Sequence, residues 1–456
     1  MEVDNIIIGG GMAGIYIAKK LQKEGKDFIL LEASGRIGGR HLTIKDNREK
    51  VMYEAGSWRV HSSHKRVIEL CEQLHLSLTH FEKQGRKEKF NGIDGLTKFD
   101  SLIIENDGDV KKALFEELKT GYQGTYDTPS NSHPYSVSTD HGEYFVIDEG
   151  QDEIINRMAK NIPDERIKLN HSVQDIIKDK EGYKIKVGRR IDFGPVEYVE
   201  IKCRFIFSCI PQNRAWRWDI SQRYLKPLLN SVKPLSLHHI YAKSKDIEIT
   251  KHTKLPSSSL AQVIPSTHGN EWFQVSYSAG RVANFWYNYK LKYGKSGLKK
   301  LLEQYFLDQK FDDVESYYWS HAYHLWRVTP YFDIKQVVKN SICPNPVKLP
   351  NLWWAGECFS SYQGWSEGAL ETADLALERR KDYLPFYKKI DIPIQEYVIF
   401  DGKIVNVKSW MSVHPGGKKA ITGHIREDIS DLFRFIKHTE LSWATLHSLQ
   451  IGYIKG

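Results

Sequence analysis

The sequence predicts a multidomain chain of the α/β class, and three observations support that prediction. The chain has 456 residues, more than one ordinary domain contains, which favours two or three domains. Its first 32 residues follow the order strand, glycine-rich turn, helix and strand. After about residue 382 a charged, proline-containing stretch precedes a short hairpin, which indicates a linker followed by a small separate domain.

Composition narrows the functional classes. Hydrophobic residues make up 41% of the chain and charged residues 27%, as in ordinary globular proteins. The formal net charge of +8 is mild and the basic residues are scattered, which argues against nucleic-acid binding. Five cysteines without a CxxC pair predict reduced thiols and a cytoplasmic location. No apolar run reaches the roughly 18 residues of a membrane span, and the first residues suit a strand rather than a signal peptide.

The first chemical signal is the turn GGGMAG, which follows the β-branched run of residues 3–8. In such a turn Gly9 makes the tight bend, Gly11 lets the backbone approach a pyrophosphate, and Gly14 lets helix and strand pack closely. The helix N-terminus that follows favours phosphate charge. Glu32 ends the next strand, where an acidic residue accepts ribose hydroxyls. The pattern predicts a dinucleotide site, although a glycine-rich turn alone also occurs in other α/β proteins.

Four further segments resemble the flavin amine oxidase family. They are EASGRIGGR at 32–40, EAGSWR at 54–59, NLWWAGE at 351–357 and GWSEGALETA at 364–373. The resemblance implies a Rossmann-like FAD-binding domain, with FAD held non-covalently because the family's cysteine attachment motif is missing. The implied cofactor-binding residues are Gly9, Gly11, Gly14, Glu32, Gly39, Arg40, Gly56, Ser57, Trp58, Val173, Gly356, Glu357, Trp365 and Ala369.

The same resemblance implies how the domains are arranged along the chain. The FAD-binding domain consists of residues 1–60, 141–234 and 345–382. An α+β substrate-binding domain, residues 61–140 and 235–344, is inserted between these pieces. Aromatic side chains are frequent in it, and most of them are expected to be core.

The resemblance also implies four catalytic residues. Arg59 lies where L-amino-acid oxidases hold the substrate carboxylate, which a guanidinium binds through two parallel bonds. Its alternative roles are binding the flavin pyrophosphate or a surface acid. Trp365 is the implied aromatic wall beside the flavin, and Tyr331 is a weaker candidate for the opposing wall. The family's flavin-facing lysine is absent, so ordinary turnover with oxygen is in question. Its nearest counterparts are His238 or His239, adjacent on a strand so that at most one faces the flavin, and His239 is the candidate.

The C-terminal stretch carries a second signal. An Asp-Gly turn between two apolar runs predicts a hairpin, and His414 follows in HPGG, where proline and two glycines hold the histidine rigidly. This resembles cytochrome b5, whose second haem histidine matches His438, with a buried aromatic at Phe433. The resemblance implies haem b with two axial histidines, a closed site suited to electron transfer. The alternative is a turn and an unrelated surface histidine. The linker is expected at residues 383–392 and this small α+β domain at 393–456.

Together these signals predict an FAD-dependent oxidoreductase of an amine or L-amino acid that passes electrons to a bis-histidine haem. The expected partners are a small-molecule substrate and a redox partner protein, without nucleic acid or a membrane span. Two alternatives stay open. One is a desaturase or oxidase of an apolar substrate on a related flavin fold, and the other is a non-catalytic flavin- or haem-binding protein.

Overall fold

The computed structural model describes residues 2–81, 142–180, 182–190, 194–247, 249, 253–255, 258–306, 309–327, 332–380, 386–387, 392 and 394–454. They form two compact units, each described by itself below. The first unit comprises residues 1–39, 155–233 and 324–456, and the second comprises 40–154 and 234–323. These units follow spatial contacts, and the domain boundaries expected from the sequence stay a prediction. Tyr331 and most of the linker expected at 383–392 lie outside the described residues.

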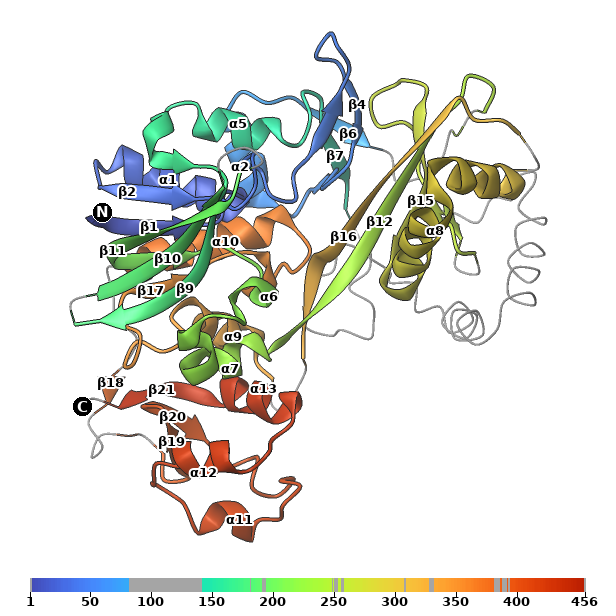
Figure 1. The fold of residues 1–456 in the computed structure, drawn as a ribbon. Coiled ribbons are helices and arrows are strands. Elements are labelled where there is room, and N and C mark those ends of the chain that lie inside the picture. Colours follow the sequence, from blue (N-terminus) through green and yellow to red (C-terminus); the bar gives the residue numbers. More distant parts are fainter. Residues whose placement is uncertain are drawn as a thin grey trace. The chain divides into compact units, whose positions relative to one another are not determined.

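The first unit is built on a seven-stranded sheet in the order β8-β2-β1-β11-β10-β9, with β17 paired to β11 (Figure 1). The predicted strands around the glycine turn are present as β1 and β2, which run parallel to each other and, through β1, to β11. β9, β10 and β11 form an antiparallel extension of this sheet. The strands are β1 (Glu2–Ile8), β2 (Phe28–Leu31), β8 (Ile167–Lys168), β9 (His171–Asp179), β10 (Gly182–Arg190), β11 (Val196–Ser208) and β17 (Leu352–Trp354).

Helices cover this sheet. In α1 (Met12–Lys23) the predicted apolar face of Ile17, Ala18 and Leu21 is fully buried. α1 packs beside α10 (Ser366–Arg379), to which the Tyr16 hydroxyl donates a 2.8 Å hydrogen bond at Asp374. Outside the C-terminal part, the other helical elements that lie wholly or mostly in this unit are α5 (Glu153–Ala159), η1 (Asp164–Arg166), α6 (Gln212–Ala215), the π-helical turn η2 (Ser221–Leu225), α7 (Lys226–Leu229), α9 (Ile334–Ile342) and η3 (Glu357–Phe359).

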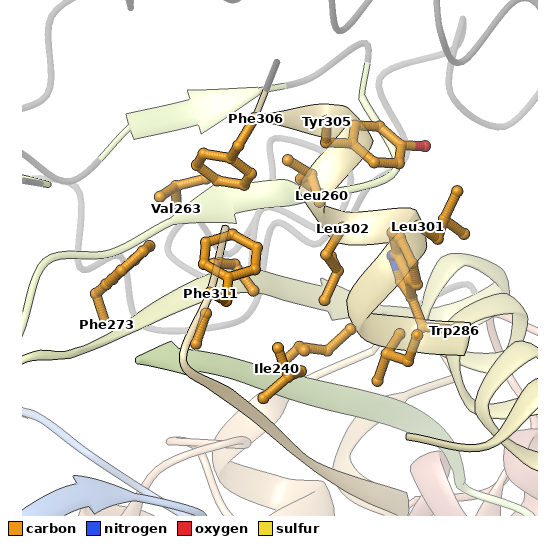
Figure 2. Close-up of a cluster of buried hydrophobic side chains, with 14 of the residues drawn as sticks. Ile240, Leu260, Val263, Phe273, Trp286, Leu301, Leu302, Tyr305, Phe306 and Phe311 are labelled. Atoms are coloured by element: carbon orange, nitrogen blue, oxygen red, sulfur yellow. The ribbon is translucent and has the colours of Figure 1, made fainter. Parts of the chain in front are cut away.

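The second unit centres on a three-stranded sheet in the order β15-β12-β16, with α8 packed on one face. The apolar core between them gathers side chains from β12, β15 and α8, including Ile240, Phe273 and Trp286 (Figure 2). α8 is kinked at Gly294, whose φ of 69° interrupts the helical backbone. The elements are α8 (Gly280–Tyr305), β12 (Val232–Lys243), β15 (Trp272–Ala279) and β16 (Asp313–Trp326).

Smaller elements complete this unit. Three strands form a sheet in the order β5-β7-β6, and β3 pairs with β4, as β13 does with β14. These elements are β3 (Thr43–Lys45), β4 (Val51–Glu54), β5 (Val60–His61), β6 (Leu78–Phe81), β7 (Tyr144–Ile147), β13 (Thr253–Leu255), β14 (Ala261–Val263) and α2 (Lys65–Gln73). Among the described residues of either unit, no helix is long and apolar enough to cross a membrane.

The C-terminal part of the first unit has a sheet of its own, in the order β18-β21-β20-β19. Its hairpin turns at Asp401 and Gly402, whose φ angles of 50° and 76° are those of the tight turn that the Asp-Gly pair predicts. β18 lies within the stretch expected as linker and pairs with β21, so the sheet includes part of that stretch. The elements are β18 (Phe386–Tyr387), β19 (Tyr397–Phe400), β20 (Lys403–Asn406), α11 (Lys419–Thr422), α12 (Ser430–Phe435), α13 (Glu440–Ser448) and β21 (Gln450–Ile454).

The buried His238 on β12 makes the second unit sensitive to acid. It is 1% exposed, neither ring nitrogen bonds to a described residue, and burial lowers its pKa to about 3. Below the unfolded pKa of about 6.5 the unfolded chain therefore binds a proton that the folded chain does not bind, so the free energy of unfolding decreases as the pH is lowered.

We expect wild type to lose about 1.5 kcal/mol more unfolding free energy than His238→Leu between pH 6.5 and 5.0 in urea titrations. His80→Leu, at a half-exposed histidine, is the control that should follow wild type. An unchanged pH slope in His238→Leu would contradict this account.

Candidate functional site

The turn between β1 and α1 leaves room for a side chain at Gly11 and none at Gly14. A Cβ on Gly14 would lie 1.9 Å from the Gly9 carbonyl oxygen, so α1 crosses β1 at a distance that only glycine permits. Gly9 has a φ of 102°, in the left-handed region. A Cβ on Gly11 would meet no described atom nearer than 4.0 Å, the Gly39 Cα. Gly11 also caps α1 without any side-chain hydrogen bond, which leaves the first N–H groups of the helix for an anion. These features fit a dinucleotide pyrophosphate.

Glu32 holds this turn from the end of β2. One carboxylate oxygen accepts a 2.7 Å hydrogen bond from the Gly10 N–H, and the other accepts from the backbone and hydroxyl of Ser34. Arg36 closes the segment by donating to the Gly39 carbonyl at 2.6 Å. Arg40, at the start of the second unit, donates to the Ala322 carbonyl at 2.7 Å. Glu32 is thus fixed beside the turn, at the position where a ribose binds in dinucleotide sites.

The second predicted cofactor segment lies at β17, η3 and the start of α10. Gly356 has a φ of 137° and open space where a Cβ would stand, and Thr372 anchors it by accepting its N–H at 2.8 Å. The buried Glu357 carboxylate accepts from the Gly364 N–H at 2.9 Å and the His324 N–H at 2.8 Å. These bonds hold the loop rigid. Trp365 is the half-buried N-cap of α10, and Ala369 is buried in the same helix, whereas Val173 is half-buried on β9.

In the second unit, the backbone of Glu54 and Ala55 is bound by side chains of the three-stranded sheet. The Tyr241 hydroxyl donates to the Glu54 carbonyl at 2.6 Å, and the Trp319 indole donates to the Ala55 carbonyl at 2.7 Å. Gly56 has no room for a side chain, because a Cβ would lie 2.0 Å from the Arg40 carbonyl oxygen. Burial raises the pKa of Glu54 to about 8 although Thr43 and Gln151 donate hydrogen bonds to its carboxylate.

Arg59 is buried in this segment, with 6% of its surface exposed. Its guanidinium carbon lies 4.6 Å from the ring centroid of Trp58 and 4.7 Å from that of Tyr144. Cation–π contacts of this kind hold a guanidinium plane in place. Ser57 precedes this pair and donates its backbone N–H to the Arg40 carbonyl at 3.0 Å.

The two adjacent histidines of β12 point to opposite faces, as alternation along a strand requires. His238 packs edge-on to Tyr318, whereas His239 packs edge-on to Tyr277 at 4.9 Å. His239 shares its face with Tyr241, so it lies on the side where residues 54 and 55 bond to the sheet. Burial lowers the pKa of His239 to about 3, so its imidazole stays neutral.

In the C-terminal part, the two predicted haem ligands are held differently. The His438 Nδ1 lies 2.9 Å from the Phe433 carbonyl oxygen and 3.0 Å from that of Ile436. A proton on Nδ1 satisfies both carbonyls, which leaves the Nε2 lone pair for a metal. The ring stacks on Phe433 with centroids 3.7 Å apart and 2° between planes. His414 lies over Gly416, where a Cβ would stand 3.0 Å from its ring.

Several large apolar side chains close to these histidines in the sequence are exposed. Phe435, at the end of α12, is 87% exposed. The other exposed apolar residues of this part are Val413, Leu432, Ile436 and Leu441. Within the described ranges, no three or more His, Cys, Asp or Glu side chains are placed to hold a metal ion. Two histidines would suffice as the protein ligands of a metal whose other donors come from a flat ligand, as the porphyrin nitrogens of haem do.

Sequence patterns had not singled out His324 or Thr372. The Nδ1 of His324 lies 3.2 Å from Glu357, a contact between residues 33 positions apart, and Thr372 anchors Gly356 from within α10. A local pattern carries no sign of such long-range partners. The predicted site residues divide between the two units, with the glycine turn, β17 and α10 in the first and residues 40–59 and His239 in the second.

Family models match both ends of the chain. The model of flavin containing amine oxidoreductases matches residues 12–133, and that of the cytochrome b5-like heme/steroid binding domain matches residues 388–455. Both resemblances predicted from the sequence are confirmed. The two families imply a flavin and a haem as cofactors.

Curated relatives match short stretches. An L-amino-acid oxidase of Mus musculus is 41% identical over 76 residues, which is 17% of this chain and 12% of that protein. Amine oxidase [flavin-containing] B of Sus scrofa is 33% identical over 100 residues, covering 20% of this chain and 19% of the relative. A pseudooxynicotine dehydrogenase of Pseudomonas sp is 33% identical over 113 residues, 25% of this chain and 20% of that one. The chain covers a fifth or less of the length of each.

Solved structures match over a much longer stretch. A putrescine oxidase bound to putrescine has a TM-score of 0.58 at 13% identity, covering 84% of this chain and 99% of that one. An engineered variant of that oxidase reaches 0.59 at 14% identity, covering 83% of this chain and 99% of the other. At such identities the likeness shows the fold, which confirms the predicted α/β class with a Rossmann-like part.

Gly11 and Gly14 allow a test of the phosphate-binding turn. Gly11→Ala should fold normally, because its Cβ meets no atom within 3.9 Å and its φ of −83° suits any residue, but it should bind flavin at least tenfold more weakly. Gly14→Ala should lower the unfolding free energy itself, since its Cβ overlaps a carbonyl oxygen. Flavin absorbance after purification and thermal unfolding measure the two effects. Full flavin retention in Gly11→Ala would contradict the assignment.

Proposed function

We propose that this chain, which joins a flavin-containing amine oxidoreductase segment to a cytochrome b5-like segment, oxidises an amine or L-amino acid and passes the electrons to haem. One observation carries the proposal. The same chain holds an open glycine turn at the start of α1 and a histidine, His438, whose Nδ1 is tied to carbonyls so that Nε2 is free. Bound flavin would supply a hydride acceptor, and bound haem would supply an acceptor of single electrons.

We assign the substrate carboxylate to Arg59. Its buried guanidinium lies over two aromatic rings, so its plane is restrained before a substrate arrives. Binding through two parallel hydrogen bonds then orients the carbon that carries the amine. A relative named L-amino-acid oxidase is 41% identical over a short stretch, which supports this substrate class.

We assign His239 the role of an uncharged hydrogen-bonding group. Burial keeps its pKa near 3, so it is a weak base and does not carry charge at neutral pH. A neutral imidazole still orients a water or a substrate amine through one ring nitrogen. Trp365 is proposed as an aromatic wall beside the reacting carbon, and Tyr331 stays the prediction for a second wall.

The cofactors are proposed to be FAD and haem b, both non-covalent. The sequence has no cysteine after Cys358, so a thioether bond to haem in the C-terminal part has no donor. All five cysteines are free thiols, which supports the expected reducing, cytoplasmic location. The terminal acceptor is proposed to be a redox partner protein, and a relative named as a dehydrogenase supports an acceptor other than oxygen.

Substitution of Arg59 tests the substrate class. In Arg59→Gln, we expect the dissociation constant for L-amino acids to rise at least tenfold, because the bidentate carboxylate contact is lost. The corresponding decarboxylated amines should be affected less than threefold. Rapid-mixing measurements of flavin reduction at varied substrate concentration supply both numbers.

Arg166→Gln is the matched control, because Arg166 also lies over an aromatic ring, that of Phe28, but outside residues 54–59. It should behave as wild type. Equal losses of affinity for amino acids and for amines in Arg59→Gln would contradict the assignment of the carboxylate to Arg59. Failure of every amine and amino acid to reduce the wild-type flavin would favour the apolar-substrate or non-catalytic alternatives.

The histidine pair is tested by haem content. His414→Ala and His438→Ala should each lose at least nine-tenths of the bound haem, because each removes an axial ligand. His424→Ala should retain it, since His424 pairs with Glu427 on the surface. Soret absorbance of protein reconstituted with haem gives the comparison. Normal haem content in both ligand variants would exclude bis-histidine binding.

A further inference from the structure

Helix α9 lies between the two parts of the first unit that the proposed function uses. On one side it packs against β17, η3 and α10, the elements of the second flavin segment, and Arg379 of α10 donates to its Lys339 carbonyl at 3.4 Å. On the other side it packs against α13 of the C-terminal part. Figure 1 shows α9 and α7 on the side of the unit that faces α13 and β21. The same nine-residue helix therefore contacts both segments.

The contacts of α9 with the C-terminal part are buried hydrogen bonds. The Asn340 amide, 2% exposed, donates to the carbonyls of His447 and Gln450, each at 3.0 Å. The Ser341 hydroxyl lies 2.9 Å from the Nε2 of His447, whose ring is fully buried. Gln336 adds a 3.2 Å bond to the Gln450 carbonyl. Removing one partner of such a bond leaves the other buried without a hydrogen-bond partner, which costs stability.

Further contacts surround this centre. The buried Tyr453 hydroxyl on β21 donates to the Cys343 carbonyl at 2.7 Å, just past the end of α9. Arg327 pairs with Glu440, the first residue of α13, at 2.5 Å. A Cβ on Gly402 would stand 2.9 Å from the Val347 side chain, so the hairpin also packs tightly against Val347. Buried hydrogen bonds and close packing are features of permanent interfaces, whereas tethered domains meet through wetter surfaces.

We propose that the C-terminal part is permanently docked on α9, so that the haem and flavin sites belong to one cooperative folding unit and binding at either site stabilises the other. The proposal rests on the proposed function only in requiring that both cofactors bind. A ligand that binds only the folded state stabilises everything that unfolds with its site. Independent modules on a linker would share none of that stabilisation.

Hydrogen exchange tests the docking without any cofactor. In the full-length protein, Asn340→Ala combined with Ser341→Ala should raise exchange at least tenfold in both α9 and β21, because each loses its buried partners. Asn5→Ala is the matched variant in the flavin part, since Asn5 is equally buried but bonds outside this interface, to the Asp27 carbonyl at 2.7 Å. Because a cooperative unit loses stability as a whole, Asn5→Ala should raise exchange in β21 as well as in β1 and β2. Unchanged exchange in β21 of this variant would overturn the cooperative unit. Unchanged exchange in β21 of the double variant would overturn the docking.

Haem loading tests the coupling. In wild type, haem at a hundredfold excess over its dissociation constant should raise the temperature of flavin release, followed by flavin fluorescence, by about 5 °C. In the double variant the same haem should protect the Soret signal and leave flavin release unchanged. Unchanged flavin release in wild type would overturn the coupling even if docking is found. Absence of bound flavin or haem in wild type would instead contradict the proposed function and leave the exchange result as the test of docking.

Discussion

The close approach of α1 to β1 is the constraint on which the flavin part depends. At Gly14 the helix passes so near the Gly9 carbonyl that no side chain fits, and this crossing brings the uncapped helix N-terminus over the end of the sheet. Glu32 then fixes the turn from β2, and Gly356 brings a second open backbone from β17. The chemistry proposed for this part depends on the space that Gly11 and Gly356 leave open beside the backbone.

A different constraint shapes the C-terminal part. Here side chains supply the site, and the orientation of the rings matters more than backbone space. The carbonyls of Phe433 and Ile436 select the His438 tautomer, and the parallel stack on Phe433 fixes the ring plane. Several apolar residues close to His438 in the sequence are exposed, Phe435 above all. The fold therefore pre-arranges both proposed sites, one through glycine and one through histidine.

Local signals in the sequence were enough for much of this account. Residues 9–14 and Glu32 follow one another in a spacing that physical needs dictate, and the Asp401-Gly402 turn carries its own conformational preference. Contacts between distant residues left no local trace. His324 meets Glu357 across 33 positions, and Ser341 meets His447 across 106. Alternation along β12 limited the flavin-facing candidates to one of two histidines, and only the packing of β4 against the sheet distinguishes them. The predicted roles of these site residues stay predictions.

The most direct test of the central claim is an anaerobic absorption spectrum of the protein loaded with both cofactors, recorded after adding one L-amino acid and no other electron acceptor. The account predicts that the flavin band bleaches and that the reduced-haem band then grows at a rate independent of protein concentration, as transfer within one chain requires. A bleached flavin beside a haem that stays oxidised, or a haem reduction rate that rises with protein concentration, would contradict it.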